Sequence, residues 1–221
     1  MIKYCIFDLD GTLLNTIKTI NYYVNCVLED ECLGSISEEE CKRFVGDGAR
    51  ILIERALGKF GVSDPKRVQL VLKKYTSLYD SAPLYLTEVY EGIREELNLL
   101  IKGGVKLAVL SNKPDFATKE VVRHLFGDGV FAAVRGAVNG VRLKPDPEAV
   151  LSLLDCLGAR REQTAFVGDT SVDILTAKNA SLALSVGVLW GFRDRAELLE
   201  NGADVILSTP QRLACEVLRY E

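Results

Sequence analysis

Hydrophobic positions follow two different patterns along the chain. From about residue 83 onward, short apolar runs alternate with segments whose apolar residues recur at helical spacing. The predicted strands are Lys106–Leu110, Ala132–Val134, Thr164–Val167, Leu182–Val186 and Val205–Leu207. The predicted helices are Gly92–Ile101, Asp115–Leu125, Pro147–Leu157, Ser171–Asn179, Arg193–Glu200 and a last one from Pro210. Strands that are apolar throughout and joined by helices indicate a parallel sheet covered on both faces. Together with the apolar run that ends at Asp8, they predict a doubly wound α/β fold.

Residues 16–81 break this alternation and carry only helical signals. Thr16 is predicted to cap a first helix, which has apolar residues at helical spacing. The segment Ser37–Glu40 has the capping-box pattern that opens a second helix. Asp64–Pro65, an N-cap followed by proline at the first helical position, opens a third. The segment is therefore predicted to be a small helical bundle.

The two patterns predict one domain inserted into another. Residues 1–15 and 82–221 form the α/β core, and residues 16–81 form an α-helical cap domain. Because the insertion follows the first strand, we expect it to lie over the carboxyl end of that strand, where α/β sheets bind their ligands. A lid in this place excludes water and then releases product, with hinges near residues 14–16 and 81–83.

The composition is ordinary for a globular protein, with 48% hydrophobic and 26% charged residues among 221. The formal net charge of −4 argues against a nucleic-acid-binding surface, which is basic. No apolar stretch approaches the roughly 20 residues that span a bilayer, and the first strand follows without a leader, so no membrane partner is expected. Six scattered cysteines without Cys-x-x-Cys spacing argue against zinc and favour a reducing, cytoplasmic setting.

Asp8 and Asp10 are the most informative residues of the sequence. The apolar run Tyr4–Phe7 ends in these two carboxylates, which Gly11 and Thr12 follow. Residues two apart on a strand point the same way, so both acids emerge together. Two such carboxylates repel each other unless a cation lies between them, and their oxygens suit Mg²⁺. One of them is also a candidate nucleophile, because Asp forms covalent phosphoryl intermediates. The alternative is a strand followed by an ordinary acidic turn.

Further polar residues lie next to later predicted elements. Ser111 and Asn112 place a hydroxyl and backbone N–H groups after the second core strand. Lys144 lies just before a helix, and Asp169 and Asp173 add two acids after another strand. Phosphoryl transfer needs such a set of metal ligands, a positive clamp, hydrogen-bond donors and a nucleophile. Singly, each has a structural explanation as a loop, a solvated lysine or helix-capping acids. Because all of these residues occur together, in the order and positions that such a site needs, they indicate a catalytic site.

In this order and spacing, the motifs resemble the haloacid dehalogenase superfamily of aspartate-nucleophile phosphatases. The motifs are Asp8-Leu-Asp-Gly-Thr12, Ser111, Lys144-Pro145 and Gly168-Asp-Thr-x-x-Asp173. The similarity covers nearly the whole chain, and the helical insertion lies where that superfamily carries its cap. The resemblance implies a Rossmann-like core and a Mg²⁺ cofactor.

The resemblance also implies a catalytic or metal-binding role for five residues. Asp8 attacks phosphorus and becomes an aspartyl phosphate. Asp10 protonates the leaving oxygen and then deprotonates the water that hydrolyses the intermediate. The Asp8 side chain, the Asp10 backbone carbonyl and Asp169 coordinate Mg²⁺. Asp173 completes the metal site by holding a metal-bound water or by orienting Lys144, the catalytic cation.

The remaining implied residues bind the substrate. Ser111 and the Asn112 N–H hold the transferring phosphoryl group, whose charge Lys144 neutralises together with that of Asp8. Thr12 supports the first loop.

Three segments resemble the phosphoglycolate phosphatase group in particular. They are residues 44–57 of the cap, Ser111-Asn112-Lys113-Pro114, and residues 186–192 continued by residues 202–204. Gly48 would let backbone approach the substrate, and Arg50 would meet a substrate carboxylate, the alternative being a solvated helix residue. The expected substrate is a small phosphorylated metabolite similar to phosphoglycolate. Ser181 departs from the glycine usual in the group.

Other functions share the core residues. A sugar-phosphate mutase resembling β-phosphoglucomutase would carry a histidine early in the cap, whereas the only one, His124, lies in a core-helix pattern. A phosphonate hydrolase would need a cap lysine, and Lys18 and Lys42 fit solvated helix faces. Pyrophosphatase activity remains an alternative. A non-catalytic binding module would be expected to have lost Asp8 or Asp10. The chain is expected to be a monomer or a weak homodimer.

Overall fold

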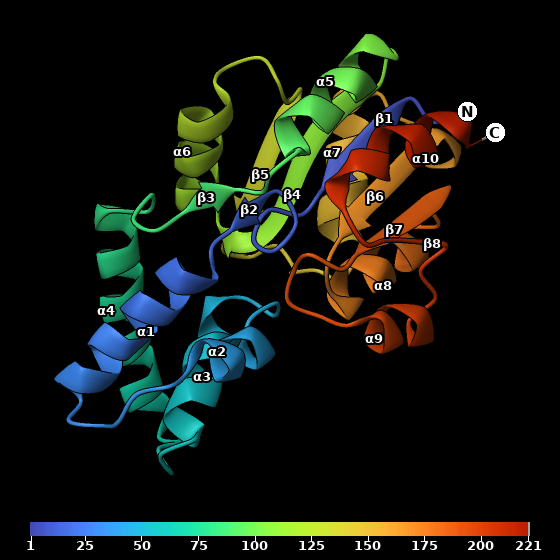
Figure 1. The fold of residues 1–221 in the computed structure, drawn as a ribbon. Helices are drawn as coiled ribbons and strands as arrows, with labels where there is room; N and C mark the ends of the chain where they lie inside the picture. The colour runs from blue at the N-terminus through green and yellow to red at the C-terminus, as the bar shows by residue number, and fades with distance from the viewer. Residues whose placement is uncertain (221) are drawn as a thin grey trace.

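The computed structural model describes residues 1–220, which form a six-stranded sheet with helices on both faces and a separate group of helices (Figure 1). The strands are β1 (Tyr4–Phe7), β2 (Leu14–Asn15), β3 (Glu88–Val89), β4 (Lys106–Pro114), β5 (Ala133–Ala137), β6 (Thr164–Gly168), β7 (Leu184–Val188) and β8 (Val205–Leu207). The α-helices are α1 (Ile17–Asp30), α2 (Glu38–Phe44), α3 (Ala49–Gly58), α4 (Pro65–Ser81), α5 (Ile93–Lys102), α6 (Asp115–Phe126), α7 (Glu148–Leu157), α8 (Ser171–Asn179), α9 (Arg195–Glu200) and α10 (Leu213–Arg219). Two short 3-10 helices are η1 (Arg161–Gln163) and η2 (Pro210–Arg212).

The large sheet has the strand order β5-β4-β1-β6-β7-β8, and every pair in it is parallel. Strand β1 lies between β4 and β6, with Phe7 in register with Val109 on one side and Val167 on the other. The chain builds outward from β1 through β4 to β5, then crosses to β6 and continues to β8. This reversal of direction is the doubly wound topology, so the predicted fold class is confirmed.

Helices cover both faces of the sheet, which is why its central strands are apolar up to their carboxyl ends. Neighbouring Ile6 and Phe7 point to opposite faces, and both are fully buried. Phe7 belongs to the layer under α5, α6 and α10, which includes Leu97 and Val121. Ile6 belongs to the opposite layer, under α7 and α8, which includes Leu153. The packed sheet fixes where each strand ends, and therefore where the polar residues after it lie.

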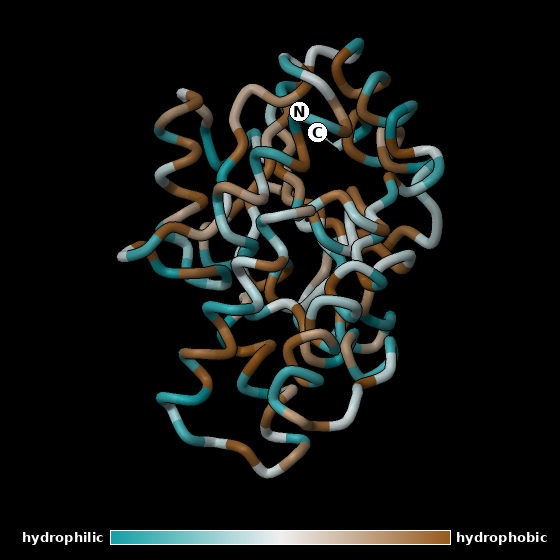
Figure 2. The backbone as a smooth tube through the Cα atoms, turned by 90° about the vertical axis from the view of Figure 1, so that its left-hand side faces the viewer, coloured by the Kyte–Doolittle hydropathy of each residue, from teal (hydrophilic) through white to brown (hydrophobic). Residues whose placement is uncertain are grey.

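Helices α1–α4 pack around one hydrophobic cluster, to which Ala117 of α6 also belongs. Its buried members include Val24 of α1, Cys41 of α2, Ile53 of α3 and Val71 of α4. Along these helices hydrophobic and hydrophilic stretches alternate, as amphipathic helices require (Figure 2). The short strands β2 and β3 pair antiparallel where the chain enters and leaves this group.

The helical group differs from the prediction in two respects. It has four helices instead of three, because α2 ends at Phe44 and α3 begins at Ala49. Between them Gly46 and Gly48 adopt φ values of +117° and +90°, which interrupt the helix. Thr16 occupies the N-cap position of α1 but makes no cap hydrogen bond, and its buried hydroxyl has no partner among the described residues.

The other two predicted caps are confirmed. Ser37 and Glu40 form a reciprocal capping box at the start of α2. Asp64 accepts hydrogen bonds from the first backbone N–H groups of α4, with Pro65 at the first helical position.

Strand boundaries shift at the edges of the site. Strand β4 runs to Pro114, whereas the predicted strand ended at Leu110, and β7 begins at Leu184, two residues after the predicted Leu182. Within the described residues, no helix combines the length and the apolar character needed to cross a membrane.

Candidate active site

The predicted core residues meet at the carboxyl edge of the sheet. Asp8 follows β1, Ser111 lies in the last part of β4, and Asp169 follows β6. Because these three strands are adjacent and parallel, their ends bring the side chains together. A pocket at this edge has walls from both the core and the helical group.

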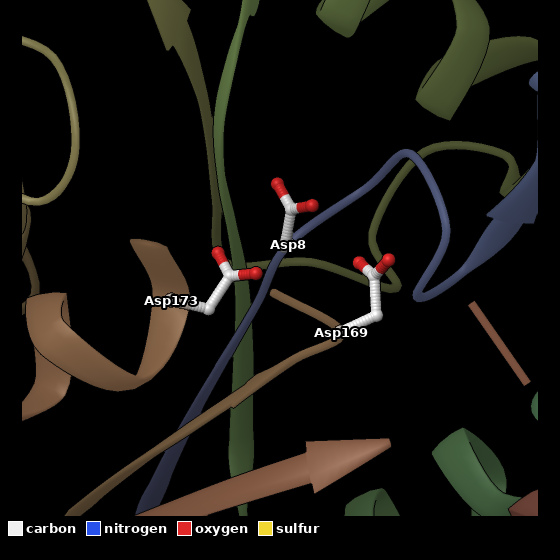
Figure 3. Close-up of side chains that lie close together, drawn as sticks. All are labelled: Asp8, Asp169 and Asp173. Atoms are coloured by element: carbon white, nitrogen blue, oxygen red, sulfur yellow. The ribbon is translucent and has the colours of Figure 1, made fainter. Parts of the chain in front are cut away.

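Three acids form a buried cluster at this edge of the sheet, and two of them, Asp8 and Asp173, line the pocket. The carboxylates of Asp8, Asp169 and Asp173 offer ligand oxygens that all lie within 4.8 Å of one another (Figure 3). Asp169 and Asp173 are almost completely buried, and Asp8 is 7% exposed. Burial raises the pKa of Asp8 to about 6, a rise that Lys144 opposes and Asp173 reinforces. Burial and the neighbouring carboxylates raise the pKa of Asp169 well above its ordinary value. The cluster is therefore short of positive charge.

Hydrogen bonds hold two of these acids in place. Thr12 donates from Oγ1 to Asp169 Oδ1 at 3.0 Å, and the backbone N–H of Phe192 donates to Oδ2 at 2.8 Å. The backbone and hydroxyl of Thr170 donate to Asp173 Oδ2 at 3.1 and 2.9 Å. Thr12, predicted to support the first loop, thus positions an acid of the cluster.

Close packing around the cluster explains a glycine of the first motif. Gly11 has a φ of +89°, a conformation that L side chains rarely adopt. A Cβ atom there would also collide with the Asp169 carboxylate. Only glycine lets the loop after β1 pass this close to the acid.

Lys144 bridges two of the acids. Its Nζ donates to Asp8 Oδ1 and to Asp173 Oδ1, each at 2.7 Å. Burial alone would lower the pKa of Lys144, but Asp173 and Asp8 together raise it above its ordinary value. The lysine therefore remains charged beside Asp8, as a phosphate clamp requires.

Asn112 connects the end of β4 to two loops of the site. Its side-chain amide donates to the carbonyl oxygens of Gly46 and Lys144 at 3.1 and 3.0 Å. The backbone N–H of Lys144 donates back to Asn112 Oδ1 at 2.9 Å. Ser111 precedes it in the pocket wall and is 5% exposed.

Lys113 and Tyr79 are site residues that our sequence analysis did not assign. Lys113 Nζ donates to both carboxylate oxygens of Asp10, at 3.0 and 3.1 Å, and to the hydroxyl of Tyr79 at 2.6 Å. Both residues are buried and line the pocket. The sequence held signals for both, since Lys113 follows Ser111-Asn112 and Tyr79 continues the helical spacing of Tyr75.

The two cap residues of the prediction have different positions. Gly48 lines the pocket, and a Cβ atom there would press on the Leu143 side chain. Arg50 does not line it: the exposed guanidinium pairs with Glu54 at 2.9 Å and hydrogen-bonds to Gln69. The structure thus places Arg50 outside the pocket with an exposed side chain, and a contact between Arg50 and a substrate carboxylate stays a prediction.

The donor set of the acidic cluster fits a divalent metal ion. Carboxylate oxygens are hard ligands, and the separation of Asp8, Asp169 and Asp173 allows one ion to contact more than one of them. The raised pKa values of Asp8 and Asp169 show how unfavourable it is to charge the cluster without a cation.

Comparisons with known proteins agree with this geometry. A family model described as haloacid dehalogenase-like hydrolase matches residues 5–186. The phosphoglycolate phosphatase of Rhodospirillum rubrum is 34% identical over 192 residues, which make up 84% of this chain and 79% of that protein. The phosphoglycolate phosphatase of Aquifex aeolicus is 31% identical over 211 residues, covering 96% of this chain and 94% of that one. A crystal structure from Lactobacillus delbrueckii subsp. bulgaricus, provisionally named a phosphoglycolate phosphatase, matches with a TM-score of 0.91 and 31% identity over 98% of each chain.

Proposed function

The chain belongs to the haloacid dehalogenase-like hydrolases and is a phosphatase, and from this premise we propose that it hydrolyses a small phosphorylated metabolite, with Mg²⁺, through an aspartyl-phosphate intermediate. The observation that carries the proposal is the position of Asp8. Its carboxylate lies at the end of the central strand, between Lys144 and two further buried acids. This arrangement supports a nucleophile beside a metal site.

In the proposed first step, an Asp8 oxygen forms a bond to phosphorus while the ester P–O bond breaks. The leaving oxygen takes a proton from Asp10. Lys144 and Ser111 bind the oxygens of the phosphoryl group, whose charge develops in the transition state. In the second step, Asp10 takes a proton from water as the water attacks phosphorus. The Asp8–phosphorus bond breaks and inorganic phosphate leaves.

Mg²⁺ would be held by Asp8, Asp169 and the backbone carbonyl of Asp10, and would neutralise the charge of the carboxylates and phosphoryl oxygens. Asp173 belongs to the same acidic cluster, and its Oδ1 accepts from Lys144 at 2.7 Å. We therefore assign Asp173 the orientation of Lys144 as well as the completion of the metal site.

Residues 16–81 are proposed to act as a cap over this chemistry. The pocket has cap residues on one wall and the catalytic residues on the other. A closed cap excludes water until the leaving group has departed, which protects the reactive phosphoryl group. The strands β2 and β3, where the chain enters and leaves the cap, are the proposed hinge.

The proposed substrate class is that of small phosphorylated metabolites similar to phosphoglycolate. Curated relatives that cover most of the chain carry the name phosphoglycolate phosphatase, which supports this choice.

All six cysteines are free thiols, which supports the proposed cytoplasmic setting. We propose a monomer or weak homodimer, and light scattering after gel filtration tests this.

Phosphate release from a panel of substrates tests the proposed function. The panel contains 2-phosphoglycolate, pyrophosphate, β-glucose 1-phosphate and several sugar phosphates, each assayed with Mg²⁺ and with EDTA. We expect release from 2-phosphoglycolate that EDTA abolishes. Mg²⁺-dependent phosphate release from many of these substrates would support the mechanism but contradict the assignment of a phosphoglycolate-like substrate. Isomerisation of the sugar phosphate without release would contradict hydrolysis.

A further inference from the structure

Lys113 is a buried cation of the pocket that the proposed mechanism does not use. Its side chain is 5% exposed and ends between Asp10 of the core and Tyr79 of the cap. Nζ lies 2.6 Å from the Tyr79 hydroxyl and 4.2 Å from the centre of its ring. A buried lysine retains its charge only beside a partner, and one side of this one faces the pocket.

Few other positive groups are available to a substrate. Among the described residues that line the pocket, Lys113 and Lys144 are the only lysines, and no arginine or histidine joins them. Lys144 is held between Asp8 and Asp173 and faces the phosphoryl end. The cap wall offers apolar side chains, hydroxyls and the carboxylate of Asp80. Among the described lining residues, Lys113 is therefore the one positive group left for a second negative group on a substrate.

The distance from Asp10 defines which part of the substrate Lys113 meets. In the proposed mechanism, Asp10 hydrogen-bonds to the ester oxygen that leaves. Lys113 Nζ lies 3.0 and 3.1 Å from the two oxygens of Asp10, so a leaving oxygen bonded to the same carboxylate would lie within about two hydrogen-bond lengths of Nζ. In the phosphate ester of a 2-hydroxy acid, only two carbon atoms separate the ester oxygen from the carboxylate oxygens, a span of about 3 Å.

We infer that Lys113 binds the carboxylate of the leaving group and makes the enzyme selective for phosphate esters of short 2-hydroxy acids. The inference rests on the proposed function and deepens it, since it assigns substrate recognition to a core residue instead of the cap arginine. Tyr79 would close over the same carboxylate, because its hydroxyl already contacts Lys113.

Asp80 sets an upper limit to the length of the acid. It lines the same pocket one residue after Tyr79, and its buried Oδ1 has no hydrogen-bond partner among the described residues. A negative group that extended past Lys113 would meet this carboxylate and be repelled. We therefore expect two-carbon acids to be preferred over longer ones.

A matched pair of substrates tests the inference. 2-Phosphoglycolate and 2-hydroxyethyl phosphate have the same length, but the second carries a hydroxyl where the first carries a carboxylate. We expect wild-type kcat/KM to favour phosphoglycolate by at least about 10-fold, since a buried charged pair distinguishes a substrate from its neutral analogue. Lys113→Met should lower both rates but reduce this ratio to near one, mainly through the KM for phosphoglycolate. Lys113→Arg should retain part of the ratio.

Controls separate recognition from folding and from positioning of Asp10. Lys66→Met removes an exposed lysine of α4 and should leave the ratio unchanged. Wild-type protein gives a test that needs no variant: glycolate should inhibit more strongly than ethylene glycol. If Lys113→Met lowers kcat/KM by the same factor for both substrates, the inference is overturned, because Lys113 would then act only through Asp10.

Two results would distinguish this inference from the proposed function. If the wild type releases phosphate from both substrates equally, the selectivity is wrong and the phosphatase mechanism stands. If it releases none from these or from a generic aryl phosphate, the proposed function fails and the inference with it.

Discussion

Asp8 is the residue on which the proposed chemistry depends most directly. Asp8→Asn keeps the shape of the side chain and its contact with Lys144 but removes the nucleophilic charge. We expect kcat to fall by at least about 10³-fold, as removal of a covalent nucleophile does in other enzymes. Single-turnover phosphate release measures this loss, and circular dichroism checks the fold. Activity within about 10-fold of wild type would exclude Asp8 as nucleophile.

The charge of the acidic cluster should link stability, pH and metal. Because the folded pKa of Asp8 is raised to about 6, this group binds its proton more tightly in the folded state than in the unfolded state. Its stabilising contribution is complete below about pH 4 and is lost as the pH rises through about 6. The metal-free protein should therefore lose stability across this window.

Mg²⁺ should reverse that loss only where the carboxylates are ionised, since protons and metal compete for the same oxygens. The increase in Tm on adding Mg²⁺ should be small near about pH 5 and clearly larger near about pH 7.5. Thermal unfolding in EDTA and in Mg²⁺ at both pH values measures it. An equal increase at both would show that the metal binds elsewhere.

Residue identities explain why some site residues were predicted and others were not. Asp8 and Asp169 directly follow predicted strands, where parallel topology forces convergence, and Lys144 stands just before a predicted helix. Lys113 and Arg50 could not be distinguished in this way. A pattern places each next to a helix or strand end, but only packing decides that Lys113 turns into the pocket and Arg50 turns outward.

At the scale of elements, Asn112 holds the end of β4 to two other loops. Asn112→Ala removes three hydrogen bonds, to Gly46 and to both backbone groups of Lys144. With about 1 kcal/mol of net stabilisation per bond, the free energy of unfolding should fall by about 2–4 kcal/mol. Urea unfolding measures the change. Asn112→Asp keeps the acceptor for the Lys144 N–H and should lose less; equal losses would place the effect elsewhere.

The ends of helices were predictable from the sequence where a local hydrogen bond determines them. Ser37 and Asp64 cap their helices because their side chains satisfy free backbone N–H groups a few residues away, which sequence reveals directly. Thr16 is also a residue that favours the N-cap and occupies that position of α1, but its hydroxyl makes no such bond. The break between α2 and α3 follows from the positive φ of Gly46 and Gly48, and glycine alone does not specify φ.

At the scale of the molecule, the core packs as one hydrophobic cluster on each face of the sheet and the cap packs around another. The pocket lies between the cap and the carboxyl edge of the sheet. Periodicity predicts each cluster because it is built from local spacing. Periodicity does not predict which side chains form contacts between the cap and the core, since those contacts join residues far apart in the sequence. Lys113 to Tyr79 is one such contact, and Arg193 provides another.

Arg193 extends from the core to the end of α2 in the cap. It donates to the carbonyl oxygens of Lys42 and Val45, the second at 2.7 Å, and Glu197 holds its Nε at 3.2 Å. Carbonyls at a helix end lack helical partners, so a charged donor there satisfies groups that water would otherwise reach. Its side chain is only 16% exposed, which makes these bonds part of the closed arrangement.

Arg193→Ala should therefore favour an open cap. We expect KM to rise several-fold with a smaller change in kcat, because the substrate must then drive closure that Arg193 supports in the wild type. Limited proteolysis should cut faster near residues 14–16 and 81–83, and small-angle scattering should show a larger radius of gyration. Arg43→Ala, on an exposed face of the same α2, is the matched control and should change none of these. If Arg193→Ala lowers only Tm while KM and proteolysis stay at wild-type values, Arg193 stabilises the fold without controlling the cap.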